Sequence, residues 1–141
     1  MGTKRVGLAR VERLLNNLSF PDGPSRLSNA VTLAGDTTLT AATHGLHPVV
    51  ITSTATLTLP AVAIGVSFWL INGCEDGTLM TVSPNANDKF LIDAAGAAGT
   101  DDKDIINTAA TAKKGDYVKL TYGSGDGWTI TELAGTWVDQ S

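Results

Sequence analysis

The chain has 141 residues, of which 43% are apolar and 17% charged, and its formal net charge is −4. This length and apolar content are typical of one globular domain with its own core, and they exclude a disordered chain. A single cysteine, Cys74, excludes an internal disulfide framework. No stretch is long and apolar enough for a transmembrane helix, and no signal-peptide pattern opens the chain, so neither membrane insertion nor secretion is expected.

The charge is distributed unevenly along the chain. Residues 1–26 carry five basic and two acidic residues, including all four arginines, whereas residues 27–141 carry five lysines and twelve acids. Arginine suits bidentate contacts with carboxylates better than lysine does. We therefore divide the chain into a basic N-terminal arm with its linker, residues 1–29, and an acidic body, residues 30–141.

The arm contains one helical pattern. Apolar residues recur at helical spacing in the segment 6–18, which predicts a short amphipathic helix. About three turns are marginal for an isolated helix in water, so this helix needs a partner surface. Two prolines and a glycine between Pro21 and Pro24 then indicate a linker. The residues expected to dock on a partner surface or a neighbouring subunit are Arg5, Arg10, Val11, Arg13, Leu14, Leu15 and Leu18.

The body shows the pattern of an all-β domain. From residue 30 onward, short runs rich in Thr, Val and Ile alternate with turn residues, which predicts a β-sandwich or jelly-roll-like body of short antiparallel strands. Segment 54–60 alternates strictly, with Ala55, Leu57 and Leu59 on one face, and is interpreted as a half-buried antiparallel strand. Segment 66–72 is apolar at its centre and predicts a central strand, either covered on both faces or with an exposed aromatic residue. No internal repeat is evident.

The clearest local signal lies near the C-terminus. Two β-rich runs, 117–122 and 128–133, flank the turn-forming residues 123–127, which predicts a hairpin. Simple alternation places Trp128, Ile130 and Glu132 on one face of the second strand. Residues 93–104, rich in Ala, Gly and Asp, predict a surface loop.

Few residues suggest chemistry. His44 and His47 have a spacing found in metal sites, but no further ligand motif accompanies them, so a structural role is favoured and no metal or other cofactor is expected. Three aspartates of the 93–104 loop, Asp101, Asp102 and Asp104, leave calcium binding open. No paired carboxylates or nucleophile motif indicate catalysis, so the protein is not expected to be an enzyme. No basic stripe with interleaved aromatics indicates nucleic-acid binding by the body.

Three tryptophans are candidates for recognition. Trp69, Trp128 and Trp137 fit either core and subunit packing or a platform for a glycan. The sequence favours packing, and it leaves the glycan platform as an alternative.

Three stretches together resemble a known group of proteins. They are the opening MGTKRVGLARVERLLNNL, the segments TATLTLP and FWLIN between Thr54 and Asn72 followed by VSPNANDKF, and the segment from Asn107 to Trp137. This pattern is similar to small virion structural proteins of tailed phages, particularly marine and cyanobacterial ones, with capsid decoration, cement or fibre-type β domains.

The resemblance implies a capsid decoration protein. Such a protein would assemble as a homotrimer on the surface of the virion, bind the major capsid protein and stabilise the head, with no nucleic-acid or membrane partner. The alternative is a head- or tail-fibre adhesin domain that binds a host surface glycan. The resemblance carries over no catalytic residues.

Overall fold

The computed structural model describes residues 29–45 and 47–141. The predicted helix of the arm, and with it every docking residue between Arg5 and Leu18, lies outside these residues. One short helix, α2, and eleven strands make up the secondary structure of the described part. The elements are β1 (Val31–Leu33), β2 (Thr37–Thr38), α2 (Ala41–His44), β3 (Pro48–Ile51), β4 (Ala55–Thr58), β5 (Ser67–Asn72), β6 (Met80–Ser83), β7 (Lys89–Phe90), β8 (Ile105–Asn107), β9 (Tyr117–Ser124), β10 (Gly127–Ala134) and β11 (Trp137–Asp139).

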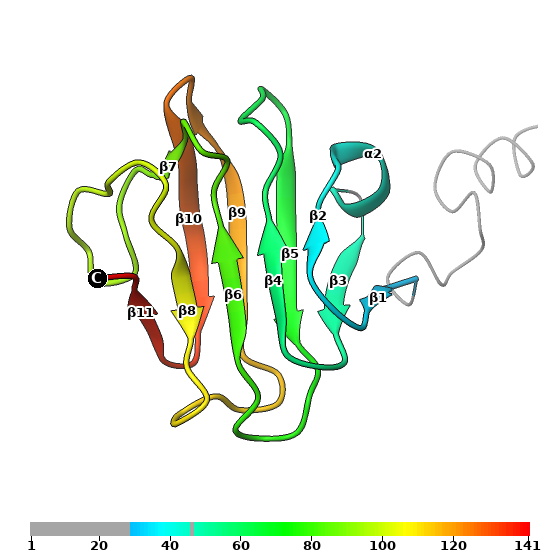
Figure 1. Cartoon of the computed structure of the whole chain (residues 1–141). Helices are drawn as coiled ribbons and strands as arrows, with labels where there is room; N and C mark the ends of the chain where they lie inside the picture. The colour runs from blue at the N-terminus through cyan, green and yellow to red at the C-terminus, as the bar shows by residue number, and fades with distance from the viewer. Residues whose placement is uncertain (1–28, 46) are drawn as a thin grey trace, which may run out of the picture.

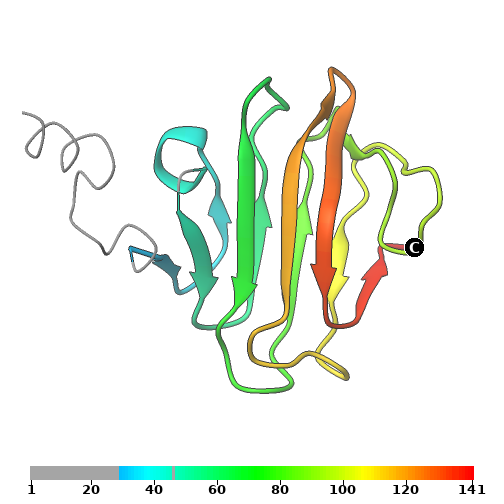
Figure 2. The ribbon, with the colours of Figure 1, turned by 180° about the vertical axis from the view of Figure 1, so that it is seen from behind.

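The strands form two mixed sheets, so the all-β class is confirmed. The six-stranded sheet has the order β1-β3-β5-β9-β10-β7, and the five-stranded sheet has the order β11-β8-β6-β4-β2. The strands stand side by side in two layers, with β1 and β2 at one end of the molecule and β7 and β11 at the other (Figures 1 and 2).

From β1 to β6 the chain alternates between the two sheets. Strands β1, β3 and β5 pair in parallel in one sheet, and β2, β4 and β6 pair in parallel in the other. Each connection between two parallel strands of one sheet therefore contains a strand of the other sheet, whereas such connections commonly contain a helix. The chain winds in successive turns of two strands, a structural repetition for which the sequence shows no matching repeat.

This winding corrects the antiparallel expectation. Segment 54–60 was expected to be antiparallel, but β4 runs parallel to both of its neighbours, β2 and β6. Ala55 and Leu57 are buried as expected. The alternation of side chains reports which face is buried and carries no information on the direction of the neighbouring strand, so the pattern could not distinguish the two pairings.

The last strands pair mainly in antiparallel fashion, although β7 pairs in parallel with β10 at the edge of the six-stranded sheet. β9 and β10 form the expected hairpin, with a tighter connection than predicted, since only Gly125 and Asp126 lie between the strands. β5 joins β9, and β6 joins β8, so the antiparallel part continues both sheets of the parallel part. The short edge strand β11 was not predicted.

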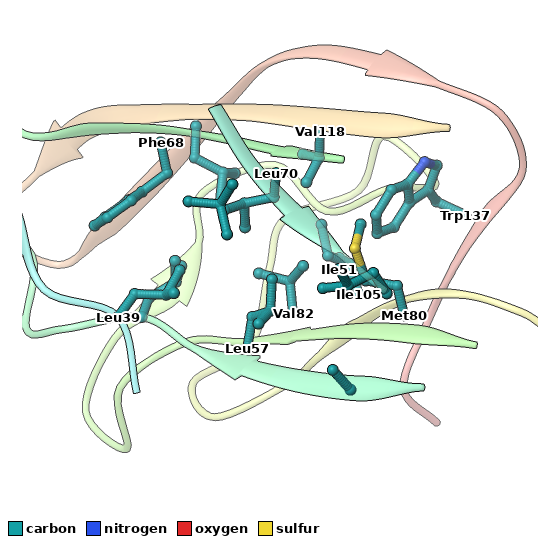
Figure 3. Packing of buried hydrophobic residues seen from close by; sticks show 14 of the residues in the cluster. Leu39, Ile51, Leu57, Phe68, Leu70, Met80, Val82, Ile105, Val118 and Trp137 are labelled. Carbon is teal, nitrogen blue, oxygen red and sulfur yellow. The ribbon is translucent and has the colours of Figure 1, made fainter. Parts of the chain in front are cut away.

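One hydrophobic core lies between the sheets. Side chains of the six-stranded sheet, such as Leu70 and Val118, meet side chains of the five-stranded sheet, such as Leu57 and Val82 (Figure 3). These four side chains are fully buried. Each such aliphatic side chain contributes about 1.5 to 3 kcal/mol when it is removed from water.

A buried polar network connects β5, β8 and the segment before β9. The Asn72 side-chain amide donates to Asn107 Oδ1 at 2.9 Å, and the Asn107 amide donates to Asp116 Oδ2 at 2.8 Å. The backbone N–H of Lys113 also donates to Asp116 Oδ2, at 2.9 Å. All three side chains of the network are buried, and hydrogen bonds of this kind stabilise a core only when every member has its partners.

Candidate functional site

The outer face of the six-stranded sheet carries the main cluster of exposed aromatic and charged side chains in the described residues. Alternation along the strands turns Phe68, Leu70 and Val118 into the core, and so turns the residues between them outward. Register pairs then align these outward residues across the sheet in rows. One row contains Pro48, Trp69, Lys119 and Glu132, and the next contains Val50, Ile71, Tyr117 and Ala134.

A β-bulge brings Glu132 to this face. The register of β9 and β10 shifts between Ile130 and Glu132, so Thr131 is the extra residue. Ile130 packs against the core, Glu132 pairs with Lys119, and Leu133 again packs against the core. The expectation that Trp128, Ile130 and Glu132 share a face is therefore wrong for Glu132, because a bulge reverses the alternation beyond it.

The central side chains of the outer face contact one another closely. The rings of Trp69 and Tyr117 meet edge to face with their centroids 6.1 Å apart. Lys119 Nζ lies 4.9 Å from the centroid of Trp69 and 5.5 Å from that of Tyr117. Lys119 Nζ is also 2.7 Å from Glu132 Oε2, and the Tyr117 hydroxyl donates to Glu132 Oε1. We call Trp69, Tyr117, Lys119 and Glu132 the outer-face cluster.

The hydrogen bonds of the cluster fix its charge state at neutral pH. The hydrogen bond from Lys119, followed by that from Tyr117, lowers the pKa of Glu132 below its usual value. The same bonds to Glu132 raise the pKa of Lys119 and the pKa of Tyr117. At neutral pH the cluster therefore contains the Lys119–Glu132 ion pair beside two aromatic rings, and the Tyr117 hydroxyl is neutral.

This arrangement is suited to binding a protein surface. Rigid aromatic side chains surrounded by polar groups with satisfied hydrogen bonds are characteristic of interface anchors. Trp69 is 36% exposed, so it remains available for contact although Lys119 lies over its ring. Of the two interpretations of segment 66–72, the strand with an exposed aromatic residue is confirmed.

The other two candidate tryptophans lie in the core. Trp128 is fully buried and packs against Phe68 with ring centroids 5.5 Å apart. Trp137 is also buried, and its indole N–H donates to the carbonyl of Ala134 at 3.0 Å. Both rings therefore pack in the core of the chain, and neither presents the exposed face that a glycan platform needs.

His44 has a structural role. It is buried, and its Nδ1 accepts a hydrogen bond of 2.9 Å from the backbone N–H of Thr40, the N-cap residue of α2. No group of three or more His, Cys, Asp or Glu side chains within residues 29–45 and 47–141 is arranged to hold a metal ion. In the 93–104 loop, Asp101 instead lies 3.6 Å from Lys89 Nζ.

The lone cysteine is buried at the end of β5. Burial raises the pKa of the Cys74 thiol, and its Sγ lies 3.5 Å from the carbonyl oxygen of Ile51. A thiol with a raised pKa is a weak nucleophile, which fits the structural interpretation of this residue.

Sequence reasoning missed three members of the outer-face cluster. Tyr117 and Lys119 alternate with the buried residues of β9, but their contact with Trp69 depends on the long-range pairing of β5 with β9. Glu132 was missed because the bulge reverses the alternation of side chains along β10. The one available signal was the alternation of Tyr117, Lys119 and Thr121 opposite the apolar face of the same strand.

Comparison with models of known protein families and with curated proteins gave no match. Among the described residues, no helix has the length and apolar character needed to cross a membrane.

Proposed function

We propose that this protein is a virion structural protein that decorates a phage capsid, with a two-layer β-sandwich body that binds the major capsid protein through the outer-face cluster. The sequence resemblance to small phage virion proteins supports the class of protein. The single observation that carries the binding role is the preformed cluster of Trp69, Tyr117, Lys119 and Glu132 on the outer face of the six-stranded sheet.

The neighbours of the cluster support a protein partner. Val50 and Ile71 lie in the adjacent row, both partly exposed, and Thr121 lies beyond Lys119 on β9. An apolar and aromatic centre with a polar surround is the composition of a protein interface. Because the ion pair is already formed in the free protein, binding does not have to order these two long side chains, which lowers its entropic cost.

The opposite surface differs in chemistry. On the outer face of the five-stranded sheet, Thr38 lies beside Thr58, and the row of Thr56 and the buried Thr81 continues to Ile106 and Val138. This row contains small hydroxyl and aliphatic side chains and no aromatic anchor. We therefore assign capsid binding to the six-stranded sheet.

Binding of a glycan by Trp69 is the second candidate, favoured by the exposure of this ring. A sugar that stacks on an aromatic residue needs an open ring face, but Lys119 already lies over Trp69 and Pro48 is its register partner on β3. A glycan would have to displace Lys119 from both the ring and Glu132. The protein interface is therefore the better explanation of the geometry.

The test is co-sedimentation of the full chain with empty capsids assembled from the cognate major capsid protein. We expect saturable binding at a fixed stoichiometry. Trp69→Ala should weaken it about 30-fold, which corresponds to the loss of roughly 2 kcal/mol at an interface anchor. Thr58→Ala, on the opposite sheet, is the matched control and should bind as the unchanged protein does.

Two results would overturn the proposal. The first is a full chain that does not sediment with capsids at any concentration. The second is a folded Trp69→Ala variant that binds normally. A glycan array in which the protein binds defined sugars, with binding lost in Trp69→Ala, would instead support the adhesin.

A further inference from the structure

The end of the molecule farthest from β1 forms a distinct acidic surface. It consists of β7, β11 and residues 91–104, which lie together at one end of both sheets (Figures 1 and 2). Residues 89–104 and 137–141 contain five aspartates and only two lysines. We call this surface the acidic end. Its aspartates are Asp93, Asp101, Asp102, Asp104 and Asp139.

The acidic end also exposes apolar side chains and contains a hollow. Ile92 is 55% exposed and Val138 is 42% exposed, two of the four large hydrophobic residues that are exposed in the described part. A hollow of about 110 Å³ is lined among others by Phe90, Thr100 and Asp139. Ile92 lies in the same segment as four of the aspartates, whereas Val138 faces the side of β11 opposite Asp139.

Hydrogen bonds hold this surface in place. The Asp139 carboxylate accepts from the backbone N–H groups of Ala94 and Ala95, at 2.8 and 3.0 Å. Asp93 Oδ1 accepts from the N–H of Ala97 at 2.8 Å, and the N–H of Asp102 donates to the carbonyl of Asp88 at 3.0 Å. The predicted loop 93–104 is thus fixed against β11, which makes it a preformed surface for a partner.

One segment of the chain complements this surface in both charge and apolar character. Residues 1–26 carry a net charge of +3, and their sequence pattern places Val11, Leu14, Leu15 and Leu18 on one helical stripe with Arg10 and Arg13 beside it. Residues 27–141 carry a net charge of −7, opposite in sign to that of the arm. The arm is the basic element that the chain provides.

We propose that the arm of one copy docks on the acidic end of a second copy. The arm joins the body at β1, and the acidic end lies across the full width of the six-stranded sheet from β1. When two copies are arranged head to tail, the arm of one copy therefore lies next to the acidic end of the other. The apolar stripe covers Ile92, and the arginines pair with the aspartates of the loop.

Such a contact is heterologous and therefore generates a ring when its rotation closes. Closure after three copies gives the homotrimer expected from the sequence resemblance. The proposal goes beyond capsid binding and is tested without capsids, so the failure of either proposal leaves the other standing.

The experiment uses light scattering on two full-length variants with opposite defects. Arg10→Glu with Arg13→Glu reverses the charge of the arm, and Asp101→Lys with Asp104→Lys reverses that of the acidic end. We expect the unchanged protein to be oligomeric and each variant alone to be monomeric at moderate salt. An equimolar mixture of the two variants should form heterodimers, since the unchanged arm of one variant can dock on the unchanged acidic end of the other.

An apolar pair of variants provides the matched control. Ile92→Asp should lower the assembled fraction at least tenfold. Ile64→Asp should leave it unchanged, because Ile64, 82% exposed in the loop between β4 and β5, is not part of the acidic end.

Three outcomes would overturn the proposal. They are a monomeric unchanged protein, normal assembly of either charge-reversal variant, and a mixture of folded variants that stays monomeric. The last result would mean that the arm docks on its own body or elsewhere.

Discussion

The two halves of this protein reach the same two sheets by different routes. From β1 to β6 the chain crosses between sheets at every connection and pairs in parallel, whereas β9 and β10 pair through a two-residue turn within one sheet. The parallel half depends on contacts between residues distant in sequence, while the hairpin is encoded locally. A sequence pattern can therefore predict a strand correctly while the direction inferred for its neighbouring strands is wrong.

The halves also differ in what they expose. The parallel half contributes Trp69, Val50 and Ile71 to the outer face, and the antiparallel half contributes Tyr117, Lys119 and Glu132. The outer-face cluster therefore exists only where β5 joins β9, at the boundary between the halves. If the cluster is the binding site, the function depends on both halves folding as one unit.

The largest expected effect comes from breaking the common core on either side of that boundary. Leu57 of β4 and Leu120 of β9 are almost fully buried in the same hydrophobic cluster. Leu57→Ala and Leu120→Ala should each destabilise the protein by about 2 to 5 kcal/mol, the usual cost of such a cavity. Urea unfolding followed by tryptophan fluorescence and by circular dichroism measures this effect.

The two probes should give coincident transitions for both core variants, because one core serves both halves. Separate transitions, with only one of them shifted in each variant, would show that the halves fold independently.

A smaller effect is expected from the buried polar network that spans the boundary. Asn107→Ala removes the acceptor of the Asn72 amide and the amide donor to Asp116. Leaving two buried polar groups without these partners should cost about 3 kcal/mol. Chemical denaturation measures the loss, and Asn87→Ala, at an exposed position between β6 and β7, is the control. Equal stabilities of the two variants would contradict the network's role.

The smallest effect concerns the ion pair of the outer-face cluster and depends on pH. The pKa of Glu132 is lowered in the folded protein, first by its hydrogen bond with Lys119. A carboxyl group with a lowered pKa stabilises the fold above its unfolded pKa, and this contribution is lost as the pH falls through the folded pKa. Glu132→Gln should therefore be less stable than the unchanged protein at neutral pH and equally stable in acid.

Thermal unfolding from neutral pH to acid follows this difference. A gap between the two proteins that stays constant down to strongly acidic pH would mean that the charge of Glu132 does not act through its pairing with Lys119.

The sequence predicted the strands of the body far better than their arrangement. Alternation located β4, the apolar centre located β5, and two β-rich runs around a turn located β9 and β10. Sequence patterns missed β11, an edge strand of three residues that is too short for a periodic pattern. They also missed α2. The four residues of this helix are held by Thr40 and by the ring of His44, and helical periodicity does not predict such contacts.

The candidate site was predictable only in part. Trp69 was named from residue type alone, as were Trp128 and Trp137, and only burial separates the first from the other two. The pairing of Trp69 with Lys119 was not predicted, because the two residues lie far apart in the sequence. The position of Glu132 depends on the bulge at Thr131, and a bulge is a local change in hydrogen bonding that side-chain patterns do not specify.

The most direct test of the central claim is hydroxyl-radical footprinting of the full chain, free and bound to empty capsids. In the free protein, Trp69 and Tyr117 should be oxidised, while the buried Trp128 and Trp137 react slowly and serve as internal references. The account predicts that capsids protect Trp69 and Tyr117 strongly. Oxidation of both residues at the same rate in saturated, capsid-bound protein would contradict the assignment of the outer-face cluster as the binding surface.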